Sequence, residues 1–471
     1  MRILMAASEC VPFAKTGGLA DVVGALPQAL AALGHEVAVM LPRYQKTKLA
    51  NPKVVISSLS VPVGSGLRFG TVLEGPTNGG VRTFFLEYPQ FFDRPELYND
   101  DKGDYPDNAE RFAFFSRAVL ETAKLVFPPD VLHCHDWQTA LVPVLKKSVY
   151  LYDWALARVP VMLTVHNLGY QGLFPPATLS TIGLSADLFH WERMEFHGVL
   201  NYLKGGLVYA DRITTVSRKY ALEIQTPEYG FGLDGVVRHR RSALAGIVNG
   251  VDYAHWDPAT DRLIAKNYSP ENLAGKAECK RDLLKQFGLP EDLQRPLIGI
   301  VSRFAAQKGF DLIAQVAADL AKENVSLVAL GTGEPEYESL FERLAHHFPK
   351  RIAVRIAYDN TLAHKIEAGA DMFLMPSRYE PCGLNQIYSL KYGTVPIVRA
   401  TGGLDDTIDA ETGFKFERYD GADLLRTIHA ALEAYRDKQR WQKMMLAGMS
   451  QDFSWANSAR QYAELYAAMV T

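Results

Sequence analysis

The chain has 471 residues, 48% of them hydrophobic and 22% charged, with a formal net charge of −3 at pH 7. This length predicts two domains. So balanced a net charge argues against a broad basic surface for nucleic acid or an anionic membrane, although it leaves room for a local basic pocket. Four cysteines that lie far apart favour reduced thiols in the cytoplasm, and no apolar run is long enough to span a membrane. The first apolar residues are too few for a secretory signal, so we expect them to form a strand.

The first half of the chain alternates between strand and helix patterns. A short apolar run at the start predicts a buried strand, and the pattern of Leu19–Leu33 predicts the helix that follows it. Three later stretches with β character, separated by Gly-rich turns, predict a β-meander insertion. The expected strands of this half cover residues 3–7, 36–41, 54–63, 69–73, 81–88, 131–134, 159–165, 212–216 and 244–248.

The second half alternates more regularly. Short apolar runs separated by helical patterns predict a parallel sheet that is covered on both faces. These runs cover residues 297–301, 325–330, 352–356, 372–375 and 395–398. The fold class is therefore α/β, with two doubly wound domains, and the boundary is expected in the less periodic stretch 250–295. In such sheets a ligand binds at the carboxyl ends of the strands.

A Gly-Gly turn lies between the first strand and the first helix. The segment from Lys15 to Asp21 reads Lys-Thr-Gly-Gly-Leu-Ala-Asp. Glycines at such a turn let the backbone approach a ligand, and the helix after it offers free N–H groups and a partial positive charge. Lys15 adds a mobile charge suited to a phosphate or a sugar hydroxyl. Taken alone, the same residues also fit a tight loop with a solvated lysine.

Arg303 and Lys308 follow the expected strand 297–301, and Gly309 opens the next helix. An Arg and a Lys five residues apart at a strand end can converge on one polyanion, although a solvated loop has the same composition. After the next expected strand, residues 325–330, Gly331 and Gly333 form a glycine pair without the third glycine of a dinucleotide fingerprint, so this signal is weak.

Two further loops follow strands of the second half. Glu380 precedes Pro-Cys-Gly-Leu, so its carboxylate could serve as a general base, a sugar-hydroxyl acceptor or half of a structural ion pair. The N–H groups of Gly383 and Leu384 are expected to point toward the ligand. After strand 395–398 comes a second Gly-Gly turn, Thr401-Gly402-Gly403-Leu404, which looks similar to the first.

Histidines close two strands of the first half. His133 and His135 alternate along a strand and precede Asp136, a pattern that could hold a metal ion, although further ligands with suitable spacing are hard to find. His166 and Asn167 end the next strand and are better placed to face a substrate. The alternative for His166 is a satisfied histidine at a helix cap.

Taken together, these motifs resemble the bacterial glycogen synthases and the plant starch synthases, with order and spacing in agreement over essentially the entire chain. The matching segments are residues 15–21, 166–167, 248–252, 302–309, 380–384 and 401–404. The resemblance implies a GT-B glycosyltransferase, with two Rossmann-like domains that face a deep cleft and a C-terminal helix that crosses back to the first. The implied boundaries are 1–250 for the acceptor side, 251–455 for the donor side and 456–471 for the crossing helix.

The implied reaction is transfer of an α-glucosyl unit from ADP-glucose to the non-reducing end of an α-1,4-glucan, with retention and release of ADP. The resemblance implies catalytic roles for His166, Asp136, Arg303, Lys308 and Glu380, with Arg303 and Lys308 on the leaving diphosphate. Asp136 is the reserve carboxylate, since front-side attack by the acceptor needs no covalent nucleophile. Substrate contacts are expected from Lys15, Gly17, Gly18, Asp21, Asn167, Asn249, Tyr358, Cys382, Gly383, Leu384, Thr401, Gly402 and Gly403, with Tyr358 stacked on adenine.

Several alternatives remain open from the sequence. Many GT-B enzymes carry a second Glu eight positions after the first, where this chain has Tyr388, so ribose recognition by a carboxylate is put in doubt. The donor could be UDP-glucose, because the preference for ADP-glucose comes from the resemblance and its compact chain length alone. Rival readings are a metallohydrolase built on His133, His135 and Asp136, and a glucan-binding or nucleotide-sensing protein. We expect no cofactor and no resident metal, and the oligomeric state cannot be predicted.

Overall fold

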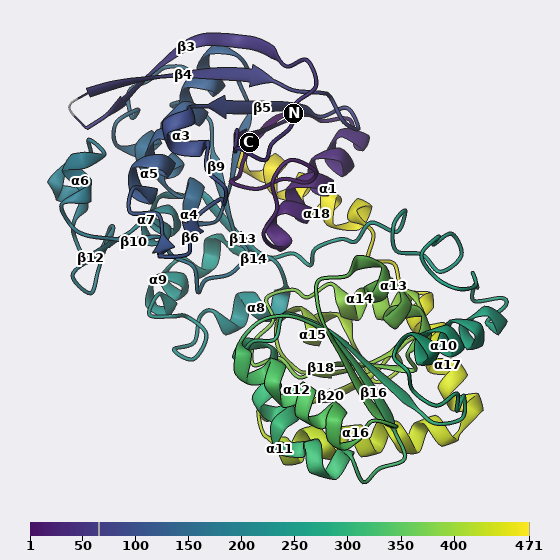
Figure 1. The fold of residues 1–471 in the computed structure, drawn as a ribbon. Coiled ribbons are helices and arrows are strands. Elements are labelled where there is room, and N and C mark those ends of the chain that lie inside the picture. The colour runs from purple at the N-terminus through teal and green to yellow at the C-terminus, as the bar shows by residue number, and fades with distance from the viewer. Residues whose placement is uncertain (65, 471) are drawn as a thin grey trace. The chain divides into compact units, whose positions relative to one another are not determined.

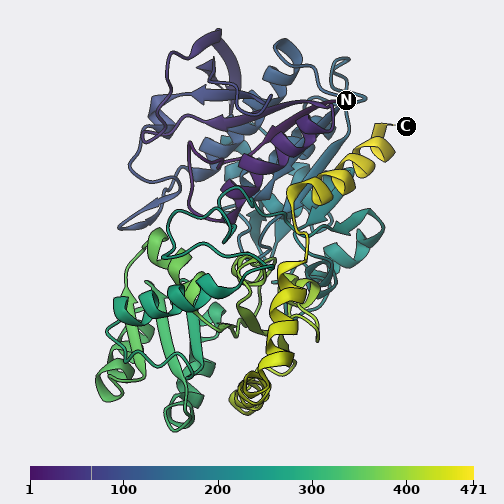
Figure 2. The ribbon, with the colours of Figure 1, turned by 90° about the vertical axis from the view of Figure 1, so that its right-hand side faces the viewer.

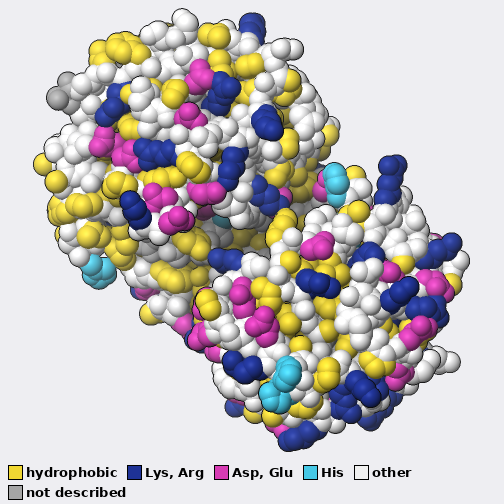
Figure 3. Space-filling view, in the orientation of Figure 1, with side chains coloured by type: hydrophobic (Ala, Val, Ile, Leu, Met, Phe, Trp, Pro, Cys, Tyr) yellow, Lys and Arg dark blue, Asp and Glu magenta, His cyan; other side chains and the backbone are white. Residues whose placement is uncertain are grey.

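The structure is a computed structural model that describes residues 1–64 and 66–470. The chain divides into two compact units (Figure 1). The first unit contains Met1–Gly250 and the C-terminal segment that begins at Trp455, and the second contains Val251–Ser454. No helix among the described residues is long and apolar enough to cross a membrane. On the face shown in Figure 3, basic and acidic side chains are interspersed, without a large area of one sign.

The first unit is built on a nine-stranded sheet. Seven neighbouring strands are parallel, and β4 and β3 extend the sheet as an antiparallel edge. The expected meander is thus β3–β4–β5, and its last strand joins the main sheet in parallel with β2. In spatial order the strands are β14 (Leu244–Gly246), β13 (Arg212–Thr215), β9 (Val161–Val165), β8 (Val131–His135), β1 (Arg2–Ala6), β2 (Glu36–Pro42), β5 (Arg82–Glu87), β4 (Gly66–Glu74) and β3 (Lys53–Val63).

Both faces of this sheet are covered, because its central strands are apolar on both faces. Leu4 and Ala6 of β1 pack into a core that also contains residues of α3 (Asn108–Leu125). Ile3 and Met5 point to the opposite face, where α1 (Gly18–Ala32) and α18 (Trp455–Val470) pack. The continuous apolar run at the start of the chain therefore forms a doubly covered strand, as the sequence predicts.

Helix α18 packs beside α1 on the first unit (Figures 1 and 2). Its buried residues Trp455, Ala459, Tyr462 and Tyr466 recur at helical spacing and join the core of this face. The Ser458 hydroxyl donates to the Val248 carbonyl at 2.6 Å, which fixes the start of the helix.

Shorter elements connect the strands of the first unit. Its remaining helices are α2 (Pro89–Phe92), α4 (Asp136–Thr139), α5 (Leu141–Lys147), α6 (Thr178–Thr181), α7 (Tyr202–Tyr209), α8 (Arg218–Glu223) and α9 (Asp234–His239), with 3-10 turns η1 (Ala186–Leu188) and η2 (Arg241–Ala243). Two small sheets contain β6 (Asn99–Asp100) with β7 (Gly103–Asp104), and β10 (Leu173–Phe174), β12 (Val199–Asn201) and β11 (Glu195–Phe196).

The second unit has a six-stranded, fully parallel sheet. In spatial order its strands are β17 (Ile352–Ile356), β16 (Ser326–Gly331), β15 (Leu297–Val301), β18 (Met372–Met375), β19 (Val395–Arg399) and β20 (Phe414–Phe416). Its helices are α10 (Ala274–Gln286), α11 (Phe310–Leu320), α12 (Pro335–His347), α13 (Asn360–Gly369), α14 (Asn385–Lys391), α15 (Gly402–Thr407), α16 (Gly421–Arg436) and α17 (Lys438–Met449), with η3 (Ala306–Lys308).

The stretch 250–295 is more ordered than its weak periodicity suggests. Trp256 lies between two other rings, stacked on His364 at 3.7 Å and on Tyr388 at 4.0 Å between centroids. The Asp261 carboxylate accepts hydrogen bonds from the Tyr392 hydroxyl and the His364 ring. Residues 251–295 are therefore part of the second unit, and Tyr388 is an outer ring of an aromatic stack.

Candidate functional site

In the first unit, polar side chains gather at the carboxyl ends of β1, β8 and β9. These strands are neighbours in the sheet, so the residues that follow them share one edge. Glu9 follows β1, Asp136 follows β8 and His166 follows β9. The structure therefore brings together two residues that the sequence singles out, Asp136 and His166, and adds Glu9.

Asp136 is held in an unusual backbone conformation. Its φ of 57° lies in the left-handed region, which Asp tolerates better than most residues. Its side chain accepts a hydrogen bond from the His166 N–H at 2.7 Å, so it ties the ends of β8 and β9 together. Burial, together with the nearby charge of Glu9, raises the pKa of Asp136 to about 7. Near neutral pH this carboxyl is thus only partly ionised.

His166 is part of a row of imidazoles. Its Nε2 lies 3.0 Å from Nδ1 of His135, so one of these rings donates to the other. Burial lowers the pKa of His166 to about 3. His166 is therefore a neutral ring that can exchange hydrogen bonds with a substrate, and it does not supply a positive charge.

His133 is occupied by the protein itself. Its Nδ1 lies 2.7 Å from the Tyr466 hydroxyl of α18, and its Nε2 lies 2.6 Å from the Thr164 hydroxyl. With both nitrogens engaged, His133 cannot ligate a metal, and no group of three or more metal-ligating side chains occurs within residues 1–64 and 66–470. The metallohydrolase reading of His133, His135 and Asp136 is thus not supported.

Hydrogen bonds to the Glu9 carboxylate hold the turn that follows Lys15. The buried Glu9 carboxylate accepts hydrogen bonds from the Thr16 N–H at 2.5 Å, the Thr16 hydroxyl at 2.6 Å and the Gly17 N–H at 3.2 Å. Lys15 and Asp21 form an ion pair at 2.7 Å, and both side chains are partly exposed. The turn is therefore rigid, with its cation at the surface.

Glycines 17 and 18 lie beside open space. A Cβ at either position would meet no other atom within 4 Å, and neither residue has a positive φ. Packing and backbone geometry thus do not require glycine here. Gly18 begins a 15-residue helix whose first N–H groups have no partner within the helix. Both observations favour close approach of a ligand to this turn.

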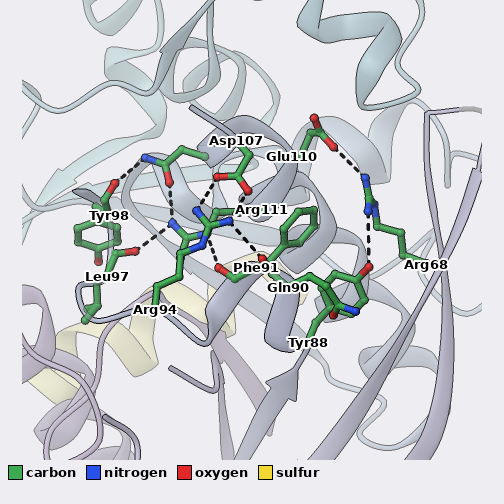
Figure 4. Close-up of polar contacts among 11 residues, drawn as sticks. Arg68, Tyr88, Gln90, Phe91, Arg94, Leu97, Tyr98, Asp107, Glu110 and Arg111 are labelled. Atoms are coloured by element: carbon green, nitrogen blue, oxygen red, sulfur yellow. Dashed lines mark hydrogen bonds and ion pairs between the residues drawn. The ribbon is translucent and has the colours of Figure 1, made fainter. Parts of the chain in front are cut away.

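A second layer of polar contacts supports Glu9. The Tyr98 hydroxyl donates to Glu9 at 2.7 Å, and the Asn108 side chain donates to the Tyr98 carbonyl at 2.9 Å. The fully buried Arg111 donates to the Leu97 carbonyl, as Figure 4 shows. Arg111 also donates to the side-chain oxygen of Asn108. Sequence reasoning missed Glu9 and Tyr98. The signal available for Glu9 was an acidic residue directly after a buried strand.

In the second unit, three loops meet at the carboxyl ends of β15, β18 and β19, which are neighbours in the sheet. The Arg378 N–H donates to the Gln307 carbonyl at 2.8 Å, so the first two loops are joined. A Cβ on Gly309, which has a φ of 79°, would lie 2.0 Å from the Pro376 carbonyl oxygen. Glycine is therefore required at this position for the loops to pack.

Lys308 pairs with Glu380. Their charged atoms lie 2.6 Å apart, and Glu380 is buried and also accepts from the Ser377 hydroxyl at 3.0 Å. Arg303 is exposed, and within residues 1–64 and 66–470 the ion pair of Lys308 is with Glu380. Arg303 and Lys308, which the sequence predicts to act as a pair, are therefore held in different ways. Lys308 is fixed by a buried carboxylate, and Arg303 extends from the loop.

The second Gly-Gly turn differs from the first. A Cβ on Gly402 would lie 1.8 Å from the Glu380 carbonyl oxygen, and one on Gly403 would lie 2.0 Å from that of Cys382. The N–H groups of Thr401, Gly403 and Leu404 donate to carbonyls of the same region. Packing thus requires these glycines, and most of the N–H groups expected to bind phosphate already have partners.

The remaining expected contacts are placed as follows. Asn167 uses its side-chain oxygen for the Gly169 N–H, at 2.9 Å. Asn249 is buried, and its side-chain oxygen has no hydrogen-bond partner within the described chain. Tyr358, after β17, is highly exposed. Cys382 is buried, Gly383 has a φ of 71°, and Leu384 caps α14.

The weak Gly331–Gly333 signal has a packing explanation. A Cβ on Gly331 would lie 1.8 Å from the Ser302 carbonyl oxygen, and one on Gly333 would lie 2.0 Å from that of Phe304. These glycines let the loop that carries Arg303 pack beside the end of β16.

Comparison with known proteins identifies a family for each half of the chain. The profile of the starch synthase catalytic domain matches residues 2–239, and that of the glycosyl transferases group 1 matches residues 283–444. A relative from Koribacter versatilis, called glycogen synthase, is 59% identical over 99% of this chain and 98% of its own length. The chain belongs to the glycogen and starch synthase family.

Two solved structures are similar to this chain in fold. The catalytic domain of starch synthase IV from Arabidopsis thaliana, bound to ADP and acarbose, is 33% identical, with a TM-score of 0.89 over 100% of this chain and 99% of its own. A sucrose-phosphate synthase from Thermosynechococcus elongatus is 19% identical, with a TM-score of 0.61 over 99% and 98%, and shows the shared fold alone. The predicted α/β class and GT-B fold are confirmed for this member of the glycogen and starch synthases.

Proposed function

We propose that this chain is a glycogen synthase that transfers an α-D-glucosyl unit from ADP-glucose to the non-reducing end of an α-1,4-glucan, with retention and release of ADP. The observation that carries the proposal is the match, over nearly the full length of both chains, to relatives called glycogen synthase. The placement of the family motifs at adjacent strand ends supports it. ADP in the related starch synthase structure supports ADP-glucose over UDP-glucose.

The second unit, Val251–Ser454, is the donor side in this proposal and ends one residue before the expected limit of residue 455. Departure of ADP places negative charge on the β-phosphate, which Arg303 and Lys308 would stabilise. Lys308 is already fixed by Glu380, so its ammonium needs little reorganisation when that charge develops. The exposed Tyr358 ring is available to stack on adenine.

The first unit, Met1–Gly250 with helix α18, is the acceptor side. The rigid turn at Gly17 and Gly18 leaves room for close approach of donor or acceptor, and Lys15 adds a charge at its surface. His166, as a neutral ring, would exchange hydrogen bonds with sugar hydroxyls at the reacting centre.

Asp136 fits poorly as a covalent nucleophile. One of its oxygens binds the His166 N–H, and its raised pKa leaves it partly protonated near neutral pH. In front-side attack the acceptor hydroxyl forms the new bond to the sugar while its proton passes to the departing phosphate oxygen. This route needs no covalent intermediate, and the role we propose for Asp136 is to hold the ends of β8 and β9. A cytoplasmic location suits the four buried, free cysteines.

A donor comparison tests the proposal. Purified protein is supplied with radiolabelled ADP-glucose or UDP-glucose and with glycogen, and incorporation into the polymer is measured. We expect incorporation from ADP-glucose to exceed that from UDP-glucose, and the product to be released by an α-1,4-specific hydrolase. Preference for UDP-glucose would overturn the donor assignment, and no incorporation from either donor would overturn the function.

A further inference from the structure

An exposed aromatic pair lies in the segment 149–158, directly after α5 in the first unit. Tyr152 is 93% exposed and Trp154 is 91% exposed, the highest fractions for large apolar side chains within residues 1–64 and 66–470. Val149 and Leu151 beside them are about half exposed. Single exposed apolar residues are ordinary, whereas several together on one short segment indicate a binding surface.

The segment that presents these rings is anchored. Tyr150 and Leu156 are buried, and Asp153 forms an ion pair with Lys124 of α3 at 2.9 Å. The Tyr150 hydroxyl donates to Glu121 of the same helix at 2.8 Å. Residues 150, 153 and 156 therefore point inward at every third position, and residues 151, 152 and 154 are left outside. The two rings are held on a fixed support, which lowers the entropy that a ligand must overcome.

The charge of the segment favours a neutral ligand. Asp153 and Arg158 are its charged residues, and Asp153 is paired with Lys124. A single-stranded nucleic acid would require a basic groove along its backbone in addition to stacking. A sugar polymer requires apolar ring faces for its C–H surfaces and polar ring edges for its hydroxyls. Tyr and Trp offer both.

The pair is also distant from the candidate site. Residues 149–158 precede β9, whereas His166 follows it, so the two lie at opposite ends of a five-residue strand. Such a strand is roughly 16 Å long. A ligand on Tyr152 and Trp154 therefore does not compete with the sugar at the reacting centre.

We propose that Tyr152 and Trp154 form a docking platform for an α-1,4-glucan chain, separate from the site where the chain end reacts. The identity of the polymer rests on the proposed function, and the platform itself rests on exposure, anchoring and charge. A platform of this kind holds a large acceptor near the enzyme between transfers and contributes nothing to short acceptors. Its occupant is thus a long glucan.

The test compares the full-length wild type with the pair variant Tyr152→Ser/Trp154→Ser. Retention by immobilised glycogen is measured without donor, and KM is measured for glycogen and for a short maltooligosaccharide. We expect glycogen retention to weaken about tenfold and the glycogen KM to rise with it, as truncated aromatic anchors usually do. The KM for the short acceptor and the kcat should stay within twofold of wild type.

Matched controls separate stacking from general surface changes. The pair variant Tyr152→Phe/Trp154→Phe keeps both rings and should retain glycogen, and Leu125→Ser, at another exposed apolar position, should behave as wild type. Unchanged retention in the Ser pair would overturn the platform, as would an equal loss with the short acceptor. A change in molar mass by light scattering with no change in glycogen retention would assign the pair to a second copy of the chain instead. Retention needs no donor, so absence of glucosyl transfer would count against the proposed function without deciding the platform.

Discussion

Replacement of Tyr98 by Phe tests whether Glu9 positions the Gly-Gly turn for the reaction. The Tyr98 hydroxyl lies 2.7 Å from both a Glu9 carboxylate oxygen and the Ser8 hydroxyl, and the ring itself packs against the core of the first unit. The substitution therefore removes one hydroxyl and changes little else. Burial holds the pKa of Tyr98 well above its usual value, so the hydroxyl keeps its proton and donates at every assay pH.

The expected magnitude follows from the partners that are lost. A hydrogen bond to a charged acceptor contributes about 1.5–3 kcal/mol. Glu9 keeps its other donors from Thr16 and Gly17, so the turn is loosened without being released. We expect the free energy of unfolding to fall by about 1.5–3 kcal/mol. A share of about 1.4 kcal/mol of this hydrogen-bond energy, spent on holding the turn in its reactive geometry, corresponds to a fall of about tenfold in kcat/KM for ADP-glucose.

Tyr44→Phe is the matched control. Tyr44 is buried in the same core and senses the charge of Glu9, yet its hydroxyl has no hydrogen-bond partner within the described chain. Removing an unsatisfied hydroxyl should leave stability unchanged or slightly higher. The assays are chemical denaturation and steady-state kinetics at saturating glycogen. Equal effects of the two substitutions, or a Tyr98→Phe enzyme within twofold of wild type in both assays, would refute the positioning argument.

Three further predictions concern residues that sequence and structure describe differently. Gly18→Ala should fold with unchanged or higher stability but bind the donor more weakly in a titration. Gly402→Ala should lower the free energy of unfolding by at least about 2 kcal/mol in thermal unfolding, because Gly402 has a φ of 46° and a Cβ there would collide with a carbonyl. Arg303→Ala and Lys308→Ala should each lower kcat by about two to three orders of magnitude, and the double variant should lose less activity than the product of the two single losses. Only Lys308→Ala should also lower the melting temperature, because it leaves the Glu380 carboxylate buried without its cation. Asp136 has a folded pKa of about 7, above its ordinary value of 3.8, so the folded state retains a proton that the unfolded state loses. Wild-type stability should therefore fall relative to Asp136→Asn from about pH 4 to about pH 7 and then stay level, as urea unfolding at pH 5 and pH 8 would detect.

The sequence predicts the fold well because apolar runs of strand length alternate with helical patterns, and loops at the carboxyl ends of parallel strands meet at one edge. Asp136 and His166 could be placed together on this basis. Tyr98 could not, because it binds Glu9 across 89 positions from a stretch without clear periodicity. The two Gly-Gly turns read alike in sequence but differ in structure, because the space beside a glycine depends on neighbours from other loops.

The bond between His133 and Tyr466 has a consequence for how the protein is made. The strand that leads to Asp136 is synthesised early, but the tyrosine that engages it belongs to α18, which leaves the ribosome only after the whole of Val251–Ser454. At usual elongation rates of about 5–20 residues per second, that interval is on the order of 10–40 s. During this time the face of the sheet that later receives Trp455, Tyr462 and Tyr466 is an open apolar groove on a nascent chain. A nonsense mutation or a protease cut just before α18 would thus damage the beginning of the protein rather than its end, and would leave a surface that chaperones bind.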